Sequence, residues 1–228
     1  MKLLMKFIII FNFFSSISFS HELYISQNIS NQNKYQLNNL IDEKFNEFKT
    51  IDSILLPSDR SNKNKLNGLN SVEINEAKNF FYNIFLSILD NNTNTFLDNL
   101  ANEIFLRSSE EDEIVKKKEI ISLNDYRYFY SVIFSEEVNN TNLSSEILIV
   151  KSLRSYLIDL LLKKSNIDIK FYIGSFRHSF TNYLVNFDRV YISSIKIKKD
   201  KNDRYLYQIG ITKINNIWKI VYFAHLIL

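Results

Sequence analysis

The sequence predicts an α+β fold in which N-terminal helices pack on a curved antiparallel sheet that ends in a three-strand meander. Apolar residues recur at helical spacing from residue 71 to residue 164, whereas β-branched and aromatic runs dominate from residue 167 onward. The last three of these runs are joined by the short connections KND and NN, which favour antiparallel pairing of neighbours. Helices followed by strands with short turns are typical of α+β proteins.

The first twenty residues, MKLLMKFIIIFNFFSSISFS, have the features of a cleaved secretory signal. Two lysines precede an apolar run, and Ser18 and Ser20 supply the small residues before a cut between Ser20 and His21. The run is shorter than the ~20 apolar residues that a membrane span requires. The sequence therefore predicts a secreted or periplasmic protein with no membrane span in its mature chain.

The composition excludes several classes of site. The chain has no cysteine, so disulfides and thiolate metal sites are impossible, and its three glycines are too few for a glycine-rich phosphate loop. Loss of the two signal lysines lowers the formal charge from +3 to +1, which gives no global attraction to nucleic acid. The three histidines lie far apart in the sequence. We therefore expect no metal, no cofactor and no nucleic-acid partner.

Residues 21–70 are predicted to form a polar leader and linker that contains one short helix. The stretches SQNISNQNKYQLNN and SDRSNKNKLNGLN are polar and low in complexity. Between them, the helix is indicated by the spacing of Ile41, Phe45, Phe48 and Ile51. Pro57 ends this segment, and the single domain proper is expected to cover residues 71–228.

Helical periodicity is strongest at the start of this domain. The predicted helices cover residues 71–90, 96–106, 122–138 and 143–164. Ser71 is the expected N-cap of the first, and the sequence NNTNT separates it from the second. The charged stretch over residues 107–119 mixes both signs, which favours a solvated loop or a turn of exposed helix.

Strands are predicted over residues 167–174, 189–200, 204–214 and 217–228. Residues 175–187 are ambiguous between strand and helix. Asn215 and Asn216 suit a two-residue hairpin turn, because asparagine tolerates positive φ angles. Both faces of the last strand are apolar, so it is expected to be central and covered on both sides. Strict alternation would place Trp218, Ile220, Tyr222 and Ala224 on one face and Val221, Phe223 and His225 on the other.

Two of these segments resemble a known family. SVEINEAKNFFYNIFLSILDNNTNTFLDNLANEIFL and the closing KINNIWKIVYF are similar to the nuclear transport factor two-like (SnoaL-like) superfamily, over about residues 71–106 and 188–223. The resemblance implies a cone-shaped fold in which a curved sheet wraps a long first helix and leaves a pocket at its wide end. The family includes isomerases, dehydratases, binding proteins and scaffold proteins, so it implies no particular activity and no catalytic motif.

The candidate site residues lie mainly in FYIGSFRHSFTNYL. Arg177 and His178 stand there among aromatic residues, including Tyr172, and such a mixture suits a small-molecule pocket. His178 can act as an acid or base near neutral pH, and Asp90 can face the same pocket. The structural alternatives are a solvated turn for Arg177–His178 and a turn-forming role for Asp90. His225 is interpreted as a core residue.

Three functions remain open from the sequence. An aromatic-rich chain without a recognisable catalytic set favours a non-enzymatic domain that binds a small apolar ligand or a protein partner. The alternative is a cofactor-free enzyme of the isomerase or dehydratase type, with His178 or Asp90 as its base. The third is a structural module in which the helix over residues 143–164 or a sheet face forms a homodimer.

Overall fold

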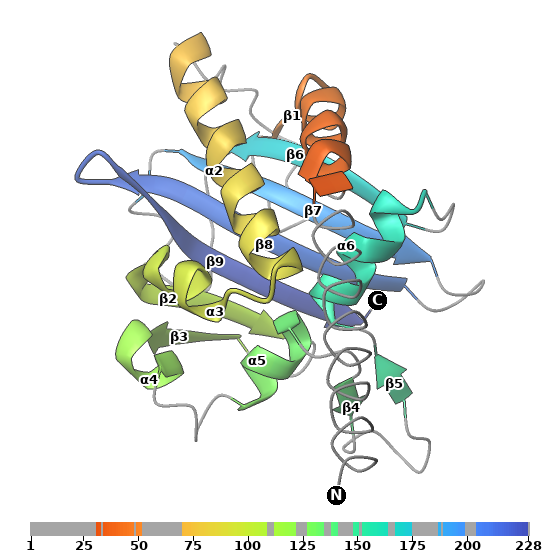
Figure 1. Cartoon of the computed structure of the whole chain (residues 1–228). Helices are drawn as coiled ribbons and strands as arrows, with labels where there is room; N and C mark the ends of the chain where they lie inside the picture. Colours follow the sequence, from red (N-terminus) through yellow and green to blue (C-terminus); the bar gives the residue numbers. More distant parts are fainter. Residues whose placement is uncertain are drawn as a thin grey trace, which may run out of the picture.

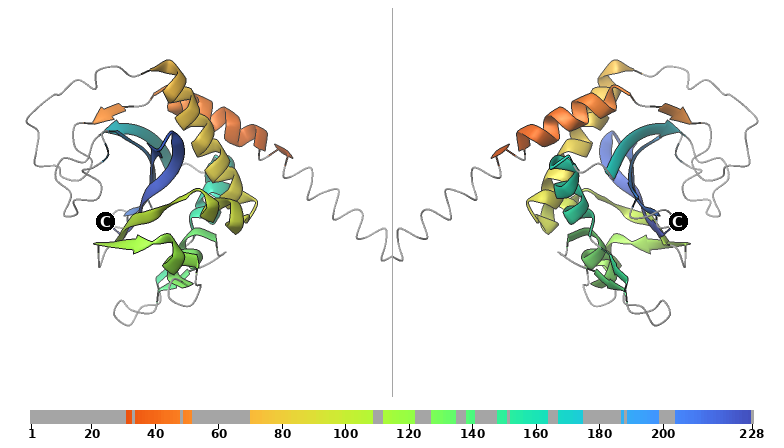
Figure 2. Two further views of the ribbon diagram at one scale, coloured as in Figure 1. Left: turned by 90° about the vertical axis from the view of Figure 1, so that its left-hand side faces the viewer. Right: turned by 90° about the vertical axis from the view of Figure 1, so that its right-hand side faces the viewer.

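The computed structural model describes residues 31–32, 34–47, 49–51, 70–108, 112–121, 127–134, 138–140, 148–150, 152–163, 167–174, 187, 189–198 and 204–227. The predicted signal peptide over residues 1–20 lies outside them. In the described part, helices lie over one face of a curled, open sheet (Figures 1 and 2). This arrangement confirms the predicted α+β class.

Seven strands form the main sheet of the described chain. Their spatial order is β1 (Lys49–Ile51), β6 (Ile167–Gly174), β7 (Val190–Lys198), β8 (Arg204–Ile214), β9 (Ile217–Ile227), β2 (Leu100–Ser108) and β3 (Asp112–Lys116). Strands β6 to β9 are antiparallel neighbours, which confirms the predicted meander and extends it by one strand. The sheet is mixed rather than antiparallel throughout, because β1 pairs with β6 and β2 with β9 in parallel. A separate pair is formed by β4 (Val138–Asn140) and β5 (Leu148–Val150).

The long helix α2 (Ser71–Leu89) matches the strongest periodic segment and crosses the sheet. Its N-cap is Asn70 rather than the expected Ser71, because the Asn70 side chain accepts a hydrogen bond of 3.0 Å from the Val72 amide. The buried stripe of α2 contains Ala77, Phe81, Ile84, Phe85 and Ile88. These apolar side chains lie in the core between the helices and the sheet.

The predicted helix over residues 96–106 is wrong beyond Asp98. A short helix, α3 (Thr93–Asp98), ends there, and the chain continues as β2. Leu100 and Ile104 face the helices, whereas Ala101 and Phe105 belong to a cluster on the other side of the sheet. A strand buried on both faces is apolar at almost every position, and this pattern also satisfies helical spacing.

The charged stretch over residues 107–119 contains the strand β3, with Val115 buried, where a solvated loop is one expectation. The short helix α4 (Lys117–Ile121) follows, which agrees with the alternative expectation of a helical turn. Glu119 accepts a hydrogen bond of 2.9 Å from the Lys116 amide at the junction of the two elements. Because β3 is the last strand in the order of the described sheet, its charged residues suit an edge position.

Two further helices cover the sheet. Helix α5 (Arg127–Phe134) lies within the predicted range of residues 122–138. Helix α6 (Leu153–Leu161) begins later than expected, since Ser152 is its N-cap and accepts a hydrogen bond of 3.2 Å from the Ser155 amide. The prediction over residues 143–164 is therefore wrong for its first part, where residues 148–150 form β5.

An N-terminal helix over residues 34–45 also belongs to the core, so the expected loose leader is wrong for this stretch. Its side chains Leu37, Ile41 and Phe45 are buried. The Phe45 ring lies 4.8 Å from that of Phe171 on β6 and 6.1 Å from that of Phe81 on α2. Leu40 packs against the same cluster, so the apolar face of this helix lies on the core. The predicted continuation to Ile51 is wrong, because residues 49–51 form β1.

Both faces of β9 are buried, as predicted for a central strand. Ile220 and Phe223 contact the core under the helices, whereas Val221, Tyr222 and Ala224 belong to the cluster on the opposite face. The strict alternation is wrong after Ile220, because the pairing changes from Ile211↔Ile220 to Gly210↔Tyr222 and leaves Val221 as an extra residue. A β-bulge of this kind exchanges the two faces of the strand.

A polar cluster fastens the start of α2 to the sheet. Glu73 accepts hydrogen bonds from Arg189 at 3.0 Å and from the Tyr191 hydroxyl at 2.8 Å. Burial, with the Glu73 carboxylate, raises the pKa of Tyr191 well above its usual range. One turn later, Glu76 forms an ion pair with Lys213 and accepts a hydrogen bond of 3.4 Å from the Trp218 indole. These contacts connect the first turns of helix α2 to the sheet and have a structural role.

Candidate functional site

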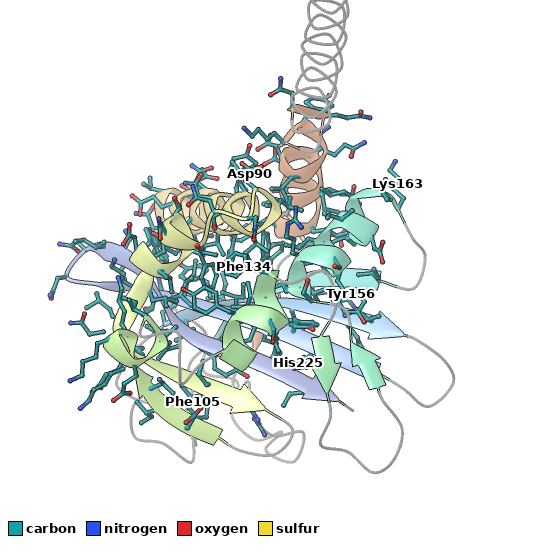
Figure 3. The ribbon with its side chains drawn as sticks, turned by 60° about the horizontal axis from the view of Figure 1, so that its bottom comes forward. Asp90, Phe105, Phe134, Tyr156, Lys163 and His225 are labelled. Carbon is teal, nitrogen blue, oxygen red and sulfur yellow. The ribbon has the colours of Figure 1, made fainter. Side chains whose placement is uncertain are left out.

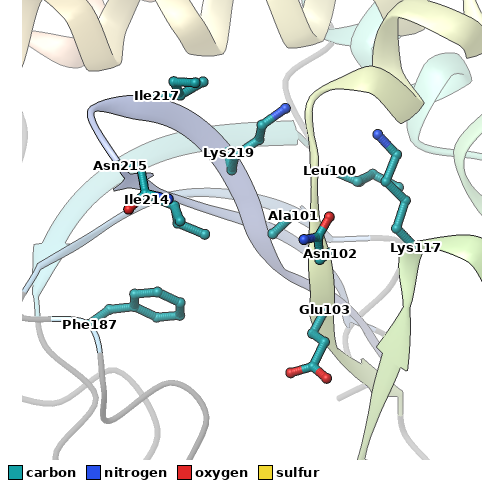
Figure 4. A pocket seen from close by; sticks show the side chains of 10 residues that line it. All are labelled: Leu100, Ala101, Asn102, Glu103, Lys117, Phe187, Ile214, Asn215, Ile217 and Lys219. Carbon is teal, nitrogen blue, oxygen red and sulfur yellow. The ribbon is translucent and has the colours of Figure 1, made fainter.

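A groove of about 740 Å³ opens beside strands β2 and β9 and is the candidate site (Figure 4). We call it the β2–β9 groove. Its lining residues are Leu100, Ala101, Asn102, Glu103, Lys117, Phe187, Ile214, Asn215, Ile217 and Lys219. They come from the start of β2, the start of α4, the segment before β7 and the tip of the β8–β9 hairpin.

The groove forms where the pairing between β2 and β9 is irregular. Leu100 pairs with Ile220, and the next pair is Phe105 with Tyr222. The β2 residues 101–104 therefore lie opposite one β9 residue, Val221. Such bulges bend strands and redirect side chains, often beside functional sites. Here the irregular stretch supplies three lining residues of β2.

The hairpin turn forms another wall of the groove. Asn215 and Asn216 have φ angles of 51° and 64°, which confirms the predicted two-residue turn with positive φ. On either side of the turn, Ile214 is half-buried and Ile217 is 59% exposed. Together with Ala101 and Phe187, these side chains give the groove an apolar lining.

Two lysines mark one end of the groove. The Lys219 ammonium donates a hydrogen bond of 2.7 Å to the backbone carbonyl of Asp98, which is the last residue of α3. Partial burial and then the charge of Lys219 lower the pKa of Lys117, and the charge of Asp98 opposes this effect. Figure 4 shows both ammonium groups directed to the same end, whereas the Glu103 carboxylate points to the other.

Two of the residues predicted for the site, Asp90 and Tyr172, belong to the described part of the chain, and neither lines this groove. Asp90 is the exposed C-cap of α2, and its carboxylate lies 4.0 Å from the Lys34 ammonium of the N-terminal helix. Tyr172 on β6 is half-buried and packs against the cluster on the opposite face of the sheet. Figure 3 shows Asp90 on the helix side of the molecule and Phe105, a member of that cluster, on the other side of the sheet. Arg177 and His178 lie outside the described residues.

His225 is buried, as its interpretation as a core residue predicts. It is 4% exposed, and its ring stacks on that of Tyr207 with centroids 4.6 Å apart. Burial lowers the pKa of His225 to about 4, so the imidazole is neutral at neutral pH. The bulge at Val221 explains why this polar side chain faces the helices and not the opposite face of the sheet.

Sequence reasoning missed the lysine pair. Lys117 belongs to the run of residues 116–118, which reads as a solvated face, and Lys219 is part of the Trp-Lys-Ile sequence of the closing strand. They meet because β2 pairs in parallel with β9 and carries β3 and α4 beside it. No local pattern in the sequence signals this juxtaposition.

Comparison with known proteins gives distant likenesses in structure. No family model matches the chain, and no curated protein matches it. A DUF4783 family protein from Bacteroides ovatus has 7% identity and a TM-score of 0.32, covering 64% of this chain and 93% of its own. A protein of unknown function with a cystatin-like fold from Nostoc punctiforme has 11% identity and a TM-score of 0.33, and the match covers 70% of this chain and 94% of that one.

A third solved structure is a putative calcium/calmodulin-dependent protein kinase II association domain from Xanthomonas campestris. It has 13% identity and a TM-score of 0.29, and the match covers 78% of this chain and 95% of that one. Likenesses at this level say nothing about the ligand, activity or assembly of the present protein.

Proposed function

We propose that this protein is a secreted or periplasmic, non-enzymatic domain that binds a small, largely apolar molecule in the β2–β9 groove. The signal-like residues 1–20 support the location. None of the helices in the described part of the chain has the length and apolar character needed to cross a bilayer.

The observation that carries the proposal is the lining of the groove. Its volume of about 740 Å³ falls within the range of small-molecule pockets, ~300–1,000 Å³. Half of its lining is apolar, and the remaining side chains are amides, amines and one carboxylate. An apolar surface with a few polar groups is what binding and orienting a small molecule require.

Our proposal includes the resemblance to the nuclear transport factor two-like superfamily, and the arrangement of helices and strands supports it. A long helix crosses a curled sheet, and the chain closes with a meander (Figure 1). The resemblance implies a pocket at the wide end of a sheet that wraps the first helix. The β2–β9 groove differs from such a pocket, because its described lining contains no residue of α2. Under α2, side chains such as Phe81, Ile84 and Phe85 are fully buried and fill the core.

The enzyme alternative gains no support from Asp90, which pairs with Lys34 at the exposed end of α2 and does not line the groove. Its other candidate base, His178, lies outside the described residues. Homodimer formation stays a prediction, and light scattering of the purified protein over a range of concentrations checks it.

A neutral fluorescent probe tests the binding function. N-phenyl-1-naphthylamine fluoresces strongly when it enters an apolar site, so titration into the purified protein should give a saturable signal. Ile217→Asp should abolish this signal, because it places a carboxylate in the apolar lining. Leu162→Asp is the matched control, since Leu162 is 64% exposed and Ile217 is 59% exposed, but only Ile217 lines the groove.

The proposal is wrong if the wild-type protein shows no saturable signal. It is also wrong if the two aspartate variants lose the signal equally. Far-UV circular dichroism of both variants shows whether either change has altered the fold.

A further inference from the structure

We propose that the ligand of the β2–β9 groove carries an anionic group, which Lys117 and Lys219 bind at one end while the apolar body of the ligand lies along the groove. The ligand class is therefore an organic anion with an apolar body, such as a carboxylate, sulfonate or phosphate ester. This inference rests on the proposed function and names the chemistry of the same site.

The first step is the position of Lys219. Lys219 lies two residues after Ile217 on β9, and both line the groove. The Lys219 ammonium donates a hydrogen bond of 2.7 Å to the Asp98 carbonyl. An ammonium has three donors, so one hydrogen bond to a carbonyl fixes its place without using all of its capacity. The group is thus held at the groove and oriented in advance of a ligand.

The second step is the proximity of Lys117. Both lysines line the groove, and Figure 4 shows their ammonium groups directed to the same end. Partial burial lowers the pKa of Lys117, and the charge of Lys219 lowers it further. Two like charges held together repel each other, and an anion placed between them would relieve this repulsion. Charge-assisted hydrogen bonds from lysine to an anionic oxygen are among the stronger contacts available to a surface site.

The third step is the local balance of charge. The charge of Asp98 raises the pKa of Lys117, but burial and the charge of Lys219 outweigh this effect, so the pKa of Lys117 is lowered. Glu103 also lines the groove, but its carboxylate is directed toward the other end (Figure 4). The lysine end of the groove therefore keeps a net positive charge, next to the apolar side chains of Leu100 and Ile217.

The test compares two probes that differ by one anionic group. 1-Anilinonaphthalene-8-sulfonate has the same aromatic amine framework as N-phenyl-1-naphthylamine and adds a sulfonate. We expect the wild-type protein to bind the sulfonate about tenfold more tightly than the neutral probe, as charge-assisted contacts to a partly exposed anion imply. Raising the salt concentration should reduce this preference.

The double variant Lys117→Met/Lys219→Met removes both charges and keeps two long apolar side chains. It should weaken binding of the sulfonate about tenfold and change binding of the neutral probe less than about twofold. Lys163→Met is the control, because Lys163 is exposed at the end of α6 and does not line the groove. Melting temperatures show that each variant remains folded.

The outcomes separate the two proposals. If neither probe binds the wild-type protein, the proposed function fails, and the inference fails with it. If both probes bind equally and the double variant changes neither affinity, the groove binds neutral ligands and the anion site is wrong. Equal loss of both probes in the double variant would give the lysines a structural role and would also overturn the anion site.

Discussion

Gly210 and Tyr222 lie opposite each other on β8 and β9, where the register of the pair changes, and a Cβ atom on Gly210 would lie 2.8 Å from the Cβ of Tyr222. Glycine is therefore required by a close approach of two strands. The approach places the Tyr222 hydroxyl 2.9 Å from the Gln208 side-chain oxygen, to which it donates a hydrogen bond. The Tyr222 ring also stacks on that of Phe105 on the neighbouring strand β2, with centroids 5.8 Å apart.

We predict that Gly210→Ala lowers the free energy of unfolding by about 2 kcal/mol. The added methyl group would overlap with the Cβ of Tyr222, and this atom cannot move unless the backbone of β9 moves with it. Urea unfolding followed by circular dichroism measures the change. In a strand without such a close contact, the same substitution would be neutral or stabilising, because alanine restricts the unfolded chain more than glycine. An unchanged or increased stability would contradict the bulge geometry.

The hairpin turn makes a second prediction. Asn216 has a φ of 64°, a region that β-branched residues occupy only with strain. Asn216→Val should therefore destabilise the protein by about 1–2 kcal/mol, whereas Asn216→Gly should leave the stability unchanged or slightly raised. Asn102→Val on the exposed side of β2 is the control and should cost little, since valine suits a strand. Equal effects at residues 216 and 102 would contradict the positive φ.

The buried His225 predicts a loss of stability in mild acid. Its pKa is lowered to about 4 in the folded protein, below the usual 6.5, so protons bind preferentially to the unfolded state. The contribution to stability is complete above pH 6.5, decreases between pH 6.5 and the folded pKa of about 4, and is lost below it. Between pH 7.5 and pH 5 the free energy of unfolding should decrease by about 2 kcal/mol.

The variant His225→Phe isolates this effect, since phenylalanine can stack on Tyr207 but does not titrate. Its free energy of unfolding should fall less between the two pH values than that of the wild type, as urea titrations at each pH would show. Phe223→Leu serves as a control for a destabilised β9 and should keep the wild-type pH dependence. If His225→Phe also kept the wild-type pH dependence, the burial assigned to His225 would be wrong.

The N-terminal helix provides the fourth prediction. Phe45 is 2% exposed and contacts the rings of Phe81 and Phe171. Phe45→Ala should therefore cost about 3–5 kcal/mol of stability. Tyr35 on the same helix is 70% exposed, and Tyr35→Ala should change the stability by less than about 0.5 kcal/mol. Thermal and urea unfolding of both variants would decide whether this helix is part of the domain.

The elements that the sequence predicts best are those whose apolar residues follow a single helical or strand spacing. Helix α2 has an apolar stripe at helical spacing, and β7, β8 and β9 are joined by short turns, so these elements and their antiparallel order are predicted correctly. The β2 segment is mistaken for a helix because its apolar residues on the two faces, Leu100 and Ile104 on one and Ala101 and Phe105 on the other, fall at intervals that also fit a helix. Leu37 is overlooked because a polar, asparagine-rich stretch surrounds it. Phe45 is placed on a predicted helix, but the same polar surroundings assign that helix to a leader outside the domain.

The candidate site could not be predicted in the same way. Its two lysines lie on α4 and β9, and the parallel pairing of β2 with β9 brings them together. No property of either lysine in its own segment encodes that pairing. The orientation of His225 depends similarly on one extra residue, Val221, and only Gly210 on the neighbouring strand hints at the bulge.

The place of β9 in the sheet has a consequence for biogenesis. This strand follows all the others along the described chain, yet it lies between β8 and β2. A polypeptide that emerges N-terminus first cannot complete the sheet until β9 has been made, and contacts between segments so distant in sequence form slowly. Until then the apolar residues of α2 and β2 lack their cover. Apolar surface that stays exposed in this way makes an incompletely folded chain prone to aggregation, and the last strand to be made removes that exposure.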